Sequence, residues 1–145
     1  MSGCDVLVVE DEHLQALEIA EALAKAGIKV CMASDGRSAY MQAVACRPRI
    51  AIIDCNLPGE NGFFVATKLT RLLPQTAIIF MSGHIDGVPE DLLEATRGRV
   101  FLNKPIPLGP LRQAVVKLLH DMKAGFDRLP GKRGWLGSGL GSPKV

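Results

Sequence analysis

Charged and hydroxyl side chains stand at the ends of four short apolar runs of this 145-residue sequence. Glu10 and Asp11 follow the first run, Asp54 follows another, and Ser82 and Lys104 come at the ends of two more. If each run is a strand of one parallel sheet, these side chains share one edge, because the carboxyl ends of parallel strands meet there. Carboxylates gathered at one place repel one another unless a cation is close. The spacing therefore predicts a cation site that only folding assembles.

Magnesium is the cation that suits this donor set. Mg²⁺ prefers oxygen ligands in an octahedron and keeps several waters, so two or three protein oxygens suffice. We expect Asp11 and Asp54 to be direct ligands and Glu10 to act through a water. The backbone carbonyl of Asn56 is the expected third protein oxygen.

Lys104 and Ser82 indicate that the same site also holds a phosphoryl group. A metal site made only of acids does not need a lysine beside it, whereas phosphoryl transfer relies on cations that stabilise the phosphoryl oxygens. Lys104 is expected to pair with one of these oxygens and Ser82 to donate to another. Asp54 is then the expected nucleophile, which would form an aspartyl phosphate.

The elements that must position these residues alternate along the chain. Short apolar runs, rich in β-branched residues, predict strands at 6–9, 28–33, 50–53, 77–81 and 99–102. Helical spacing of apolar residues predicts helices at 14–24, 36–46, 61–73, 89–96 and 108–122. Such alternation is typical of an α/β, doubly wound fold with a five-stranded parallel sheet covered on both faces.

Length and charge favour one domain, at residues 1–123, followed by a tail at 124–145. The tail is rich in glycine and carries four basic residues and one acidic residue, so we expect it to be flexible. The formal net charge of the whole chain is only +2, so residues 1–123 do not form a basic platform for nucleic acid. The tail is also too short to fold into a DNA-binding output domain.

The apolar runs and the cysteines indicate the cellular compartment in which we expect the protein. No apolar run approaches the roughly 18 residues of a membrane span, and no basic stretch precedes an apolar one at the start of the sequence. A cytoplasmic protein is therefore expected. The four cysteines form no C-x-x-C pair, and we expect all of them to be reduced.

Four motifs, taken together and in this order, carry a family resemblance. They are V-V-E-D-E at 8–12, I-I-D-C-N-L-P-G at 52–59 with Gly62 following, M-S-G at 81–83 and F-L-N-K-P at 101–105. Over about residues 5–122 the chain resembles the receiver domain of two-component response regulators, of the stand-alone type. This resemblance implies a flavodoxin-like sheet with strand order 2-1-3-4-5, in which strands are counted along the chain.

The resemblance also implies a function. It implies Mg²⁺-dependent transfer of a phosphoryl group to Asp54 from the phosphohistidine of a sensor histidine kinase or a histidine phosphotransfer protein. The chain would then be a signalling phosphoacceptor rather than an enzyme that acts on other substrates. Ser82 and Phe101 match the positions of the family's switch residues. Helix 89–96, strand 99–102 and helix 108–122 would contact an output protein.

Two other functions stay open. One is an interaction module on the same fold that works without phosphorylation, although such modules usually lose an acid or the lysine. The other is a different Mg²⁺ enzyme that cleaves nucleic acid or phosphomonoesters. Such enzymes favour D-x-D on the third strand, where this chain has Asp54-Cys55-Asn56. His84 is either an exposed loop residue or a group that positions the water for dephosphorylation.

Overall fold

Strands and helices alternate along the chain as the sequence predicts. The computed structural model describes residues 3–83, 98–123 and 134–136, and describes side chains at 3–83 and 102–123. The strands are β1 (Val6–Val9), β2 (Val30–Ala33), β3 (Ile50–Asp54), β4 (Asn56–Leu57), β5 (Glu60–Asn61), β6 (Ala77–Ser82), β7 (Gly98–Asn103) and β8 (Gly134–Leu136). The helices are α1 (His13–Ala24), α2 (Gly36–Cys46), α3 (Gly62–Leu72) and α5 (Leu108–Lys123). The helix expected at 89–96 lies outside the described residues.

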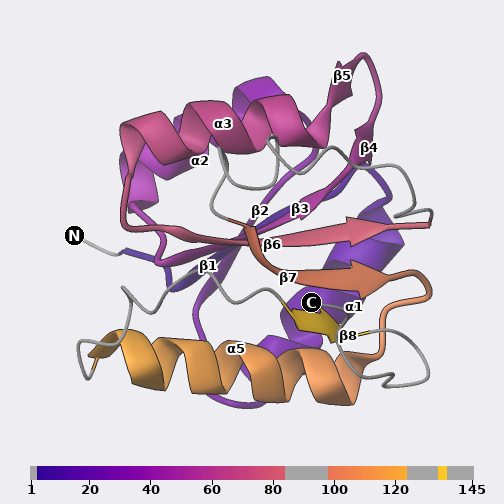
Figure 1. Cartoon of the computed structure of the whole chain (residues 1–145), viewed down its shortest axis with the longest axis vertical. Helices are drawn as coiled ribbons and strands as arrows, with labels where there is room; N and C mark the ends of the chain where they lie inside the picture. Colours follow the sequence, from indigo (N-terminus) through magenta and orange to yellow (C-terminus); the bar gives the residue numbers. More distant parts are fainter. Residues whose placement is uncertain (1–2, 84–97, 124–133, 137–145) are drawn as a thin grey trace.

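One parallel sheet forms the centre of the molecule. Its strand order is β2-β1-β3-β6-β7-β8, so the order expected for the five main strands is confirmed. All neighbours in this sheet are parallel; β1, for example, pairs Val6 with Val30 of β2 on one side and with Ile50 of β3 on the other. Figure 1 shows α2 and α3 on one face of the sheet and α1 and α5 on the other. The doubly wound α/β architecture is therefore confirmed.

A sixth strand joins the sheet from the segment that we expected to be a tail. β8 pairs in parallel with β7, and Phe101 is opposite Trp135 in the register. Without β8, β7 would present a row of unpaired backbone groups at the edge of the sheet, and pairing satisfies them. Residues 134–136 of the expected tail therefore pair with the sheet, whereas the division of the chain at residue 123 and the flexibility of the tail stay predictions.

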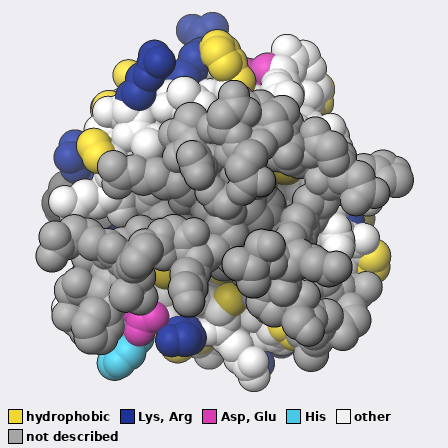
Figure 2. Space-filling model, in the orientation of Figure 1, with side chains coloured by type: hydrophobic (Ala, Val, Ile, Leu, Met, Phe, Trp, Pro, Cys, Tyr) yellow, Lys and Arg dark blue, Asp and Glu magenta, His cyan; other side chains and the backbone are white. Residues whose placement is uncertain are grey.

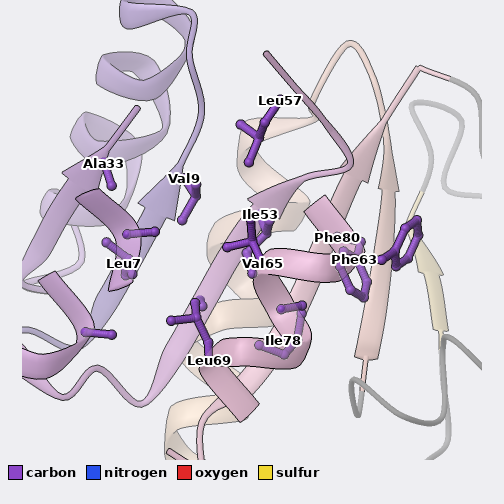
Figure 3. Packing of buried hydrophobic residues seen from close by; sticks show 14 of the residues in the cluster. Leu7, Val9, Ala33, Ile53, Leu57, Phe63, Val65, Leu69, Ile78 and Phe80 are labelled. Atoms are coloured by element: carbon purple, nitrogen blue, oxygen red, sulfur yellow. The ribbon is translucent and has the colours of Figure 1, made fainter. Parts of the chain in front are cut away.

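Alternate residues of the central strands fill two separate cores. Leu7 and Val9 of β1 face α2 and α3, and they pack in a cluster with Phe63 and Phe80. Figure 3 shows this cluster between the sheet and α3. Val6 and Val8 belong to the opposite cluster, under α1 and α5. Successive side chains of a strand point to opposite faces, which is why apolar runs without alternation predicted strands buried on both sides.

Side-chain caps explain where two helices begin. Asp35 accepts a hydrogen bond from the backbone N–H of Ser38 at 2.8 Å, and this capping box starts α2 at the predicted residue. Asn61 accepts from the N–H of Phe63 at 2.7 Å and caps α3. The antiparallel pair β4–β5 just before α3 was not predicted, because strands of two residues leave no periodic signal.

The cysteines differ from the expectation. Cys4 and Cys31 form a disulfide, whereas Cys46 and Cys55 are free. Pairing of β1 with β2 brings the first two within reach, since their Cα atoms are 6.3 Å apart. The expectation that all four are reduced is therefore wrong for this pair. Within the part of the chain that the structure describes, no helix is long and apolar enough to cross a membrane.

Candidate functional site

The strand ends deliver their polar side chains to one edge of the sheet, as predicted. Glu10 directly follows β1, Asp54 is the last residue of β3, Ser82 is the last of β6, and Lys104 directly follows β7. Neighbouring strands hold this alignment, since Ser82 is opposite Asn103 in the β6–β7 register. Glu10, Asp54 and Ser82 are each only 2% exposed although they are polar. Buried polar groups need partners, so the contacts among them define the site.

Lys104 joins two of the acids. Its Nζ lies 2.9 Å from Oδ2 of Asp54 and 3.1 Å from Oε1 of Glu10. The lysine side chain is 23% exposed, whereas the two carboxylates are almost completely buried. The peptide bond that follows Lys104 is cis. The ammonium group therefore sits at the mouth of the site, with the two acids beneath it.

Burial and neighbouring charges shift the pKa values of both Glu10 and Lys104. Burial is the main reason that the pKa of the Glu10 carboxyl rises to about 7, and the nearby charge of Asp54 adds to the rise. Burial alone would lower the pKa of the Lys104 ammonium, but its hydrogen bonds to Asp54 and Glu10 and their charges outweigh burial and raise that pKa. One lysine therefore stays charged, yet it does not hold Glu10 ionised at acidic pH.

The backbone around Asp54 fixes the orientation of its carboxylate. Oδ1 accepts a hydrogen bond from the N–H of Asn56 at 2.9 Å, while Oδ2 faces Lys104. Gly62 lies against this segment: a Cβ added there would clash with the Asp54 carbonyl oxygen and come within 2.8 Å of the Cys55 Cα. Only glycine allows α3 to start this close to the end of β3.

A hard divalent cation fits the donor set. Carboxylate oxygens of Glu10, Asp11 and Asp54 lie within 4.8 Å of one another. Asp11 is exposed and the other two are buried, so the cluster opens to solvent on one side. Among the described residues, Lys104 is the cation paired with these acids, so three carboxylates leave an excess of negative charge there, and oxygen ligands of this kind suit Mg²⁺.

The remaining predicted residues are placed in part. Asn56 is the first residue of β4 and its side chain is exposed. Phe101 lies in β7 opposite Phe80, but its side chain is outside the described part. His84 lies outside the described residues altogether.

Sequence reasoning missed one contact within the site. One oxygen of Glu10 is bonded directly to Lys104 and the other accepts from the N–H of Glu12 at 3.1 Å; the expected role of Glu10 towards Mg²⁺, through a water, stays a prediction. The positions of Glu10 and Lys104 at strand ends indicated that they gather at one edge of the sheet, but the sequence carried no signal for the direct bond between them.

A hollow between α2 and α3, of about 900 Å³, contains none of the predicted site residues. Its lining residues are Gly36, Arg37, Tyr40, Met41, Glu60, Lys68, Arg71 and Leu72. Figure 2 shows Lys and Arg side chains gathered at the upper edge of the molecule, where α2 and α3 lie. The acidic cluster and this basic hollow are therefore separate features.

Comparison of the sequence with models of known protein families identifies the family of this chain. The model described as "Response regulator receiver domain" matches residues 6–116, which include every strand of the main sheet except β8. The chain belongs to the response regulator receiver domain family. As a receiver, it carries its acids, hydroxyl and lysine at the strand ends where the sequence resemblance placed them.

Similar proteins agree with this assignment. The receiver is 32% identical over 119 residues to a protein-glutamate methylesterase/protein-glutamine glutaminase of Archaeoglobus fulgidus, covering 77% of this chain and 34% of that protein. It is 29% identical over 120 residues to the autoinducer 1 sensor kinase/phosphatase LuxN of Vibrio campbellii, covering 82% of this chain and 14% of that protein. The chain thus spans well under half the length of both relatives.

Solved structures share the fold. A response regulator receiver domain protein (CheY-like) from Methanospirillum hungatei JF-1 superimposes with a TM-score of 0.79 at 18% identity, over 86% of this chain and 99% of that one. At this identity the similarity concerns the fold alone.

Proposed function

We propose that this receiver is a phosphoacceptor of a two-component phosphorelay, in which Asp54 takes a phosphoryl group from a phosphohistidine. The observation that carries the proposal is the contact of the buried Asp54 carboxylate with the partly exposed Lys104, beside two further acids. In the reaction a carboxylate oxygen of Asp54 forms a bond to phosphorus, the bond from phosphorus to the histidine nitrogen breaks, and the freed imidazole takes up a proton.

The residues around Asp54 suit this reaction. Mg²⁺ bound by Asp11, Asp54 and the Asn56 carbonyl would supply positive charge to the phosphoryl oxygens. Lys104 already faces Asp54 and is therefore placed to pair with an oxygen of the incoming group. Glu10, whose carboxylate lies in the same acidic cluster, would hold a metal-bound water. Ser82, buried at the neighbouring strand end, is the proposed donor to another phosphoryl oxygen.

The partners follow from the reaction. A sensor histidine kinase or a histidine phosphotransfer protein would supply the phosphoryl group. We propose that this transfer takes place in the cytoplasm. The relative LuxN, whose name describes a sensor kinase/phosphatase, contains a matching segment. The signal would leave through a protein contact on the surface around β7 and α5, with Ser82 and Phe101 as the switch residues.

Intact-mass measurement after incubation with acetyl phosphate and Mg²⁺ tests the proposal. We expect one phosphoryl adduct on the wild type, none on Asp54→Asn, and none on the wild type when a chelator removes Mg²⁺. Asp121→Asn is the matched control, because this acid pairs with Lys117 on the surface of α5, and it should label like the wild type. Labelling of Asp54→Asn at the wild-type level would refute Asp54 as the acceptor.

Because some receivers reject small phosphodonors, an unlabelled wild type is then tested with beryllofluoride, a phosphoryl mimic. Binding that requires both Mg²⁺ and Asp54 would support the proposal. Failure of both probes would instead favour an interaction module that works without phosphorylation.

A further inference from the structure

Three cysteines converge at the edge of the sheet formed by β2. Cys4 precedes β1, Cys31 lies in β2, and Cys46 is the last residue of α2. Their Sγ atoms all lie within 4.8 Å of one another. Cys4 and Cys31 form the disulfide, and Cys46 is a free thiol beside it. None of these residues contributes to the acidic site, so their convergence needs its own explanation.

The fold itself brings the three sulfurs together. Parallel pairing places Cys31 opposite Leu7, and the N–H of Asp5 donates to the carbonyl of Lys29 at 2.8 Å, which holds the start of the chain along β2. Gly3 passes the end of α2 so closely that an added Cβ would lie 3.2 Å from the Cys46 carbonyl oxygen. The cluster is thus held by backbone contacts that do not depend on the disulfide.

We propose that the reduced thiols of Cys4, Cys31 and Cys46 form a binding site for Zn²⁺. Around a tetrahedral Zn²⁺ with Zn–S bonds of about 2.3 Å, neighbouring sulfurs lie about 3.8 Å apart. The present separations of at most 4.8 Å therefore need only side-chain rotations to reach this geometry. Thiolates are soft ligands that select Zn²⁺ and Cu⁺ over Mg²⁺, so this site and the acidic site would take different metals.

The surroundings of Cys46 favour a cation. Because Cys46 is the last residue of α2, a metal there meets the negative end of the helix dipole. Gln42 lies one turn earlier, and its side-chain oxygen is 3.6 Å from the Cys46 sulfur. This oxygen or a water would complete four-fold coordination.

Metal binding and the disulfide exclude each other. Reduction by a trialkylphosphine cleaves the S–S bond: the two sulfurs take up two electrons and two protons, while phosphorus is oxidised and takes the oxygen of water. Zn²⁺ then displaces the protons of all three thiols, so that Zn²⁺ and three thiols give a zinc tris-thiolate and three protons. The disulfide is the oxidised, metal-free form of the same site.

Cobalt titration of the reduced full-length chain under anaerobic conditions tests the proposal. Co²⁺ replaces Zn²⁺ in thiolate sites and gives sulfur-to-cobalt charge-transfer absorption, which oxygen ligands do not give. The signal therefore separates this site from the acidic cluster. We expect it to saturate at one equivalent of Co²⁺ and to disappear when Zn²⁺ is added.

Two variants complete the test. Cys46→Ser should lower the affinity for Co²⁺ by more than about 100-fold, because even loss of an outer partner of a ligand costs about 10- to 100-fold. Cys55→Ala should bind like the wild type, since Cys55 is a buried free cysteine that does not belong to the group formed by Cys4, Cys31 and Cys46. Absence of charge-transfer absorption in the reduced wild type, or its survival at full strength in Cys46→Ser, would overturn the proposal.

Discussion

Nζ of Lys104 lies 2.9 Å from Oδ2 of Asp54, although 50 positions separate the two residues in the sequence. The same nitrogen lies 3.1 Å from Oε1 of Glu10, 94 positions away. One cation therefore ties together the ends of β1, β3 and β7, and it does so beside the residue that we propose to be phosphorylated. Because Lys104 contacts both acids, a change in the charge of any of the three side chains should alter the stability of the fold and also the site of phosphorylation that we propose.

Replacement of Lys104 by Met should destabilise the fold. The change leaves Glu10 and Asp54 buried without a cation, and because the lysine is partly exposed we expect a loss of about 1–3 kcal/mol in the free energy of unfolding at neutral pH, less than for a fully buried pair. Lys117→Met is the control, since that lysine is exposed and pairs with Asp121 on the helix surface, and it should change stability by less than about 1 kcal/mol. Urea unfolding measures both, and equal losses would contradict the account.

Glu10 should make stability fall as pH rises. Its pKa is about 7 in the folded protein and about 4.5 in the unfolded chain, so the folded state binds more protons between these values. The stabilising contribution of Glu10 is complete below about pH 4.5 and is lost as pH rises through about 7. Urea unfolding with a chelator present should show this slope in the wild type and a flatter profile in Glu10→Gln. A Glu18→Gln control, changed at an exposed position of α1, should keep the wild-type slope.

Mg²⁺ should stabilise the folded receiver through Asp11. A ligand at about 100 times its dissociation constant adds about 2.7 kcal/mol to the free energy of unfolding. Thermal unfolding with increasing Mg²⁺ should show a rising Tm for the wild type and a much smaller rise for Asp11→Asn. The rise should be larger at pH 8 than at pH 6, because Glu10 is ionised above its folded pKa of about 7. The same Mg²⁺ response in both proteins would exclude Asp11 as a ligand.

Gly62→Ala should displace the backbone at Asp54. The added methyl group meets the Asp54 carbonyl oxygen and the Cys55 Cα, and overpacking of this kind costs about 1–3 kcal/mol. Labelling by acetyl phosphate should also slow, because the end of β3 must shift. Gly109→Ala is the matched control: nothing lies within 4 Å of a Cβ at this helical position. It should leave labelling unchanged, and a Gly62→Ala protein that labels and unfolds like the Gly109→Ala protein would be evidence against the close packing.

Much of the fold could be predicted because local and tertiary preferences agree. The helix predicted at 36–46 has the bounds of α2, and its apolar spacing agrees with the side-chain cap that Asp35 provides through Ser38 in the structure. The strand predicted at 28–33 was too long at its start: Ile28 is bonded back to Leu23 at the end of α1, so pairing in β2 begins only at Val30. Apolar character alone does not distinguish a buried turn from a strand.

The site could be predicted as a set of residues but not as a set of contacts. Position at a strand end indicated which residues gather, because the edge of a parallel sheet is determined by topology. The direct bond of Glu10 to Lys104 depends on which strands are neighbours and on how deeply each side chain is buried. The convergence of Cys4, Cys31 and Cys46 was missed for a related reason, since it depends on the register of the edge strand β2.

The most direct measurement of the central claim is to locate the phosphoryl group. After incubation with acetyl phosphate and Mg²⁺, borohydride reduces an aspartyl phosphate to homoserine, and tandem mass spectrometry of the peptides identifies the converted residue. We predict conversion at Asp54 and not at Asp11, with the conversion lost when Mg²⁺ is removed. Conversion at another acid, with Asp54 unchanged, would contradict the claim that this buried carboxylate is the phosphoacceptor.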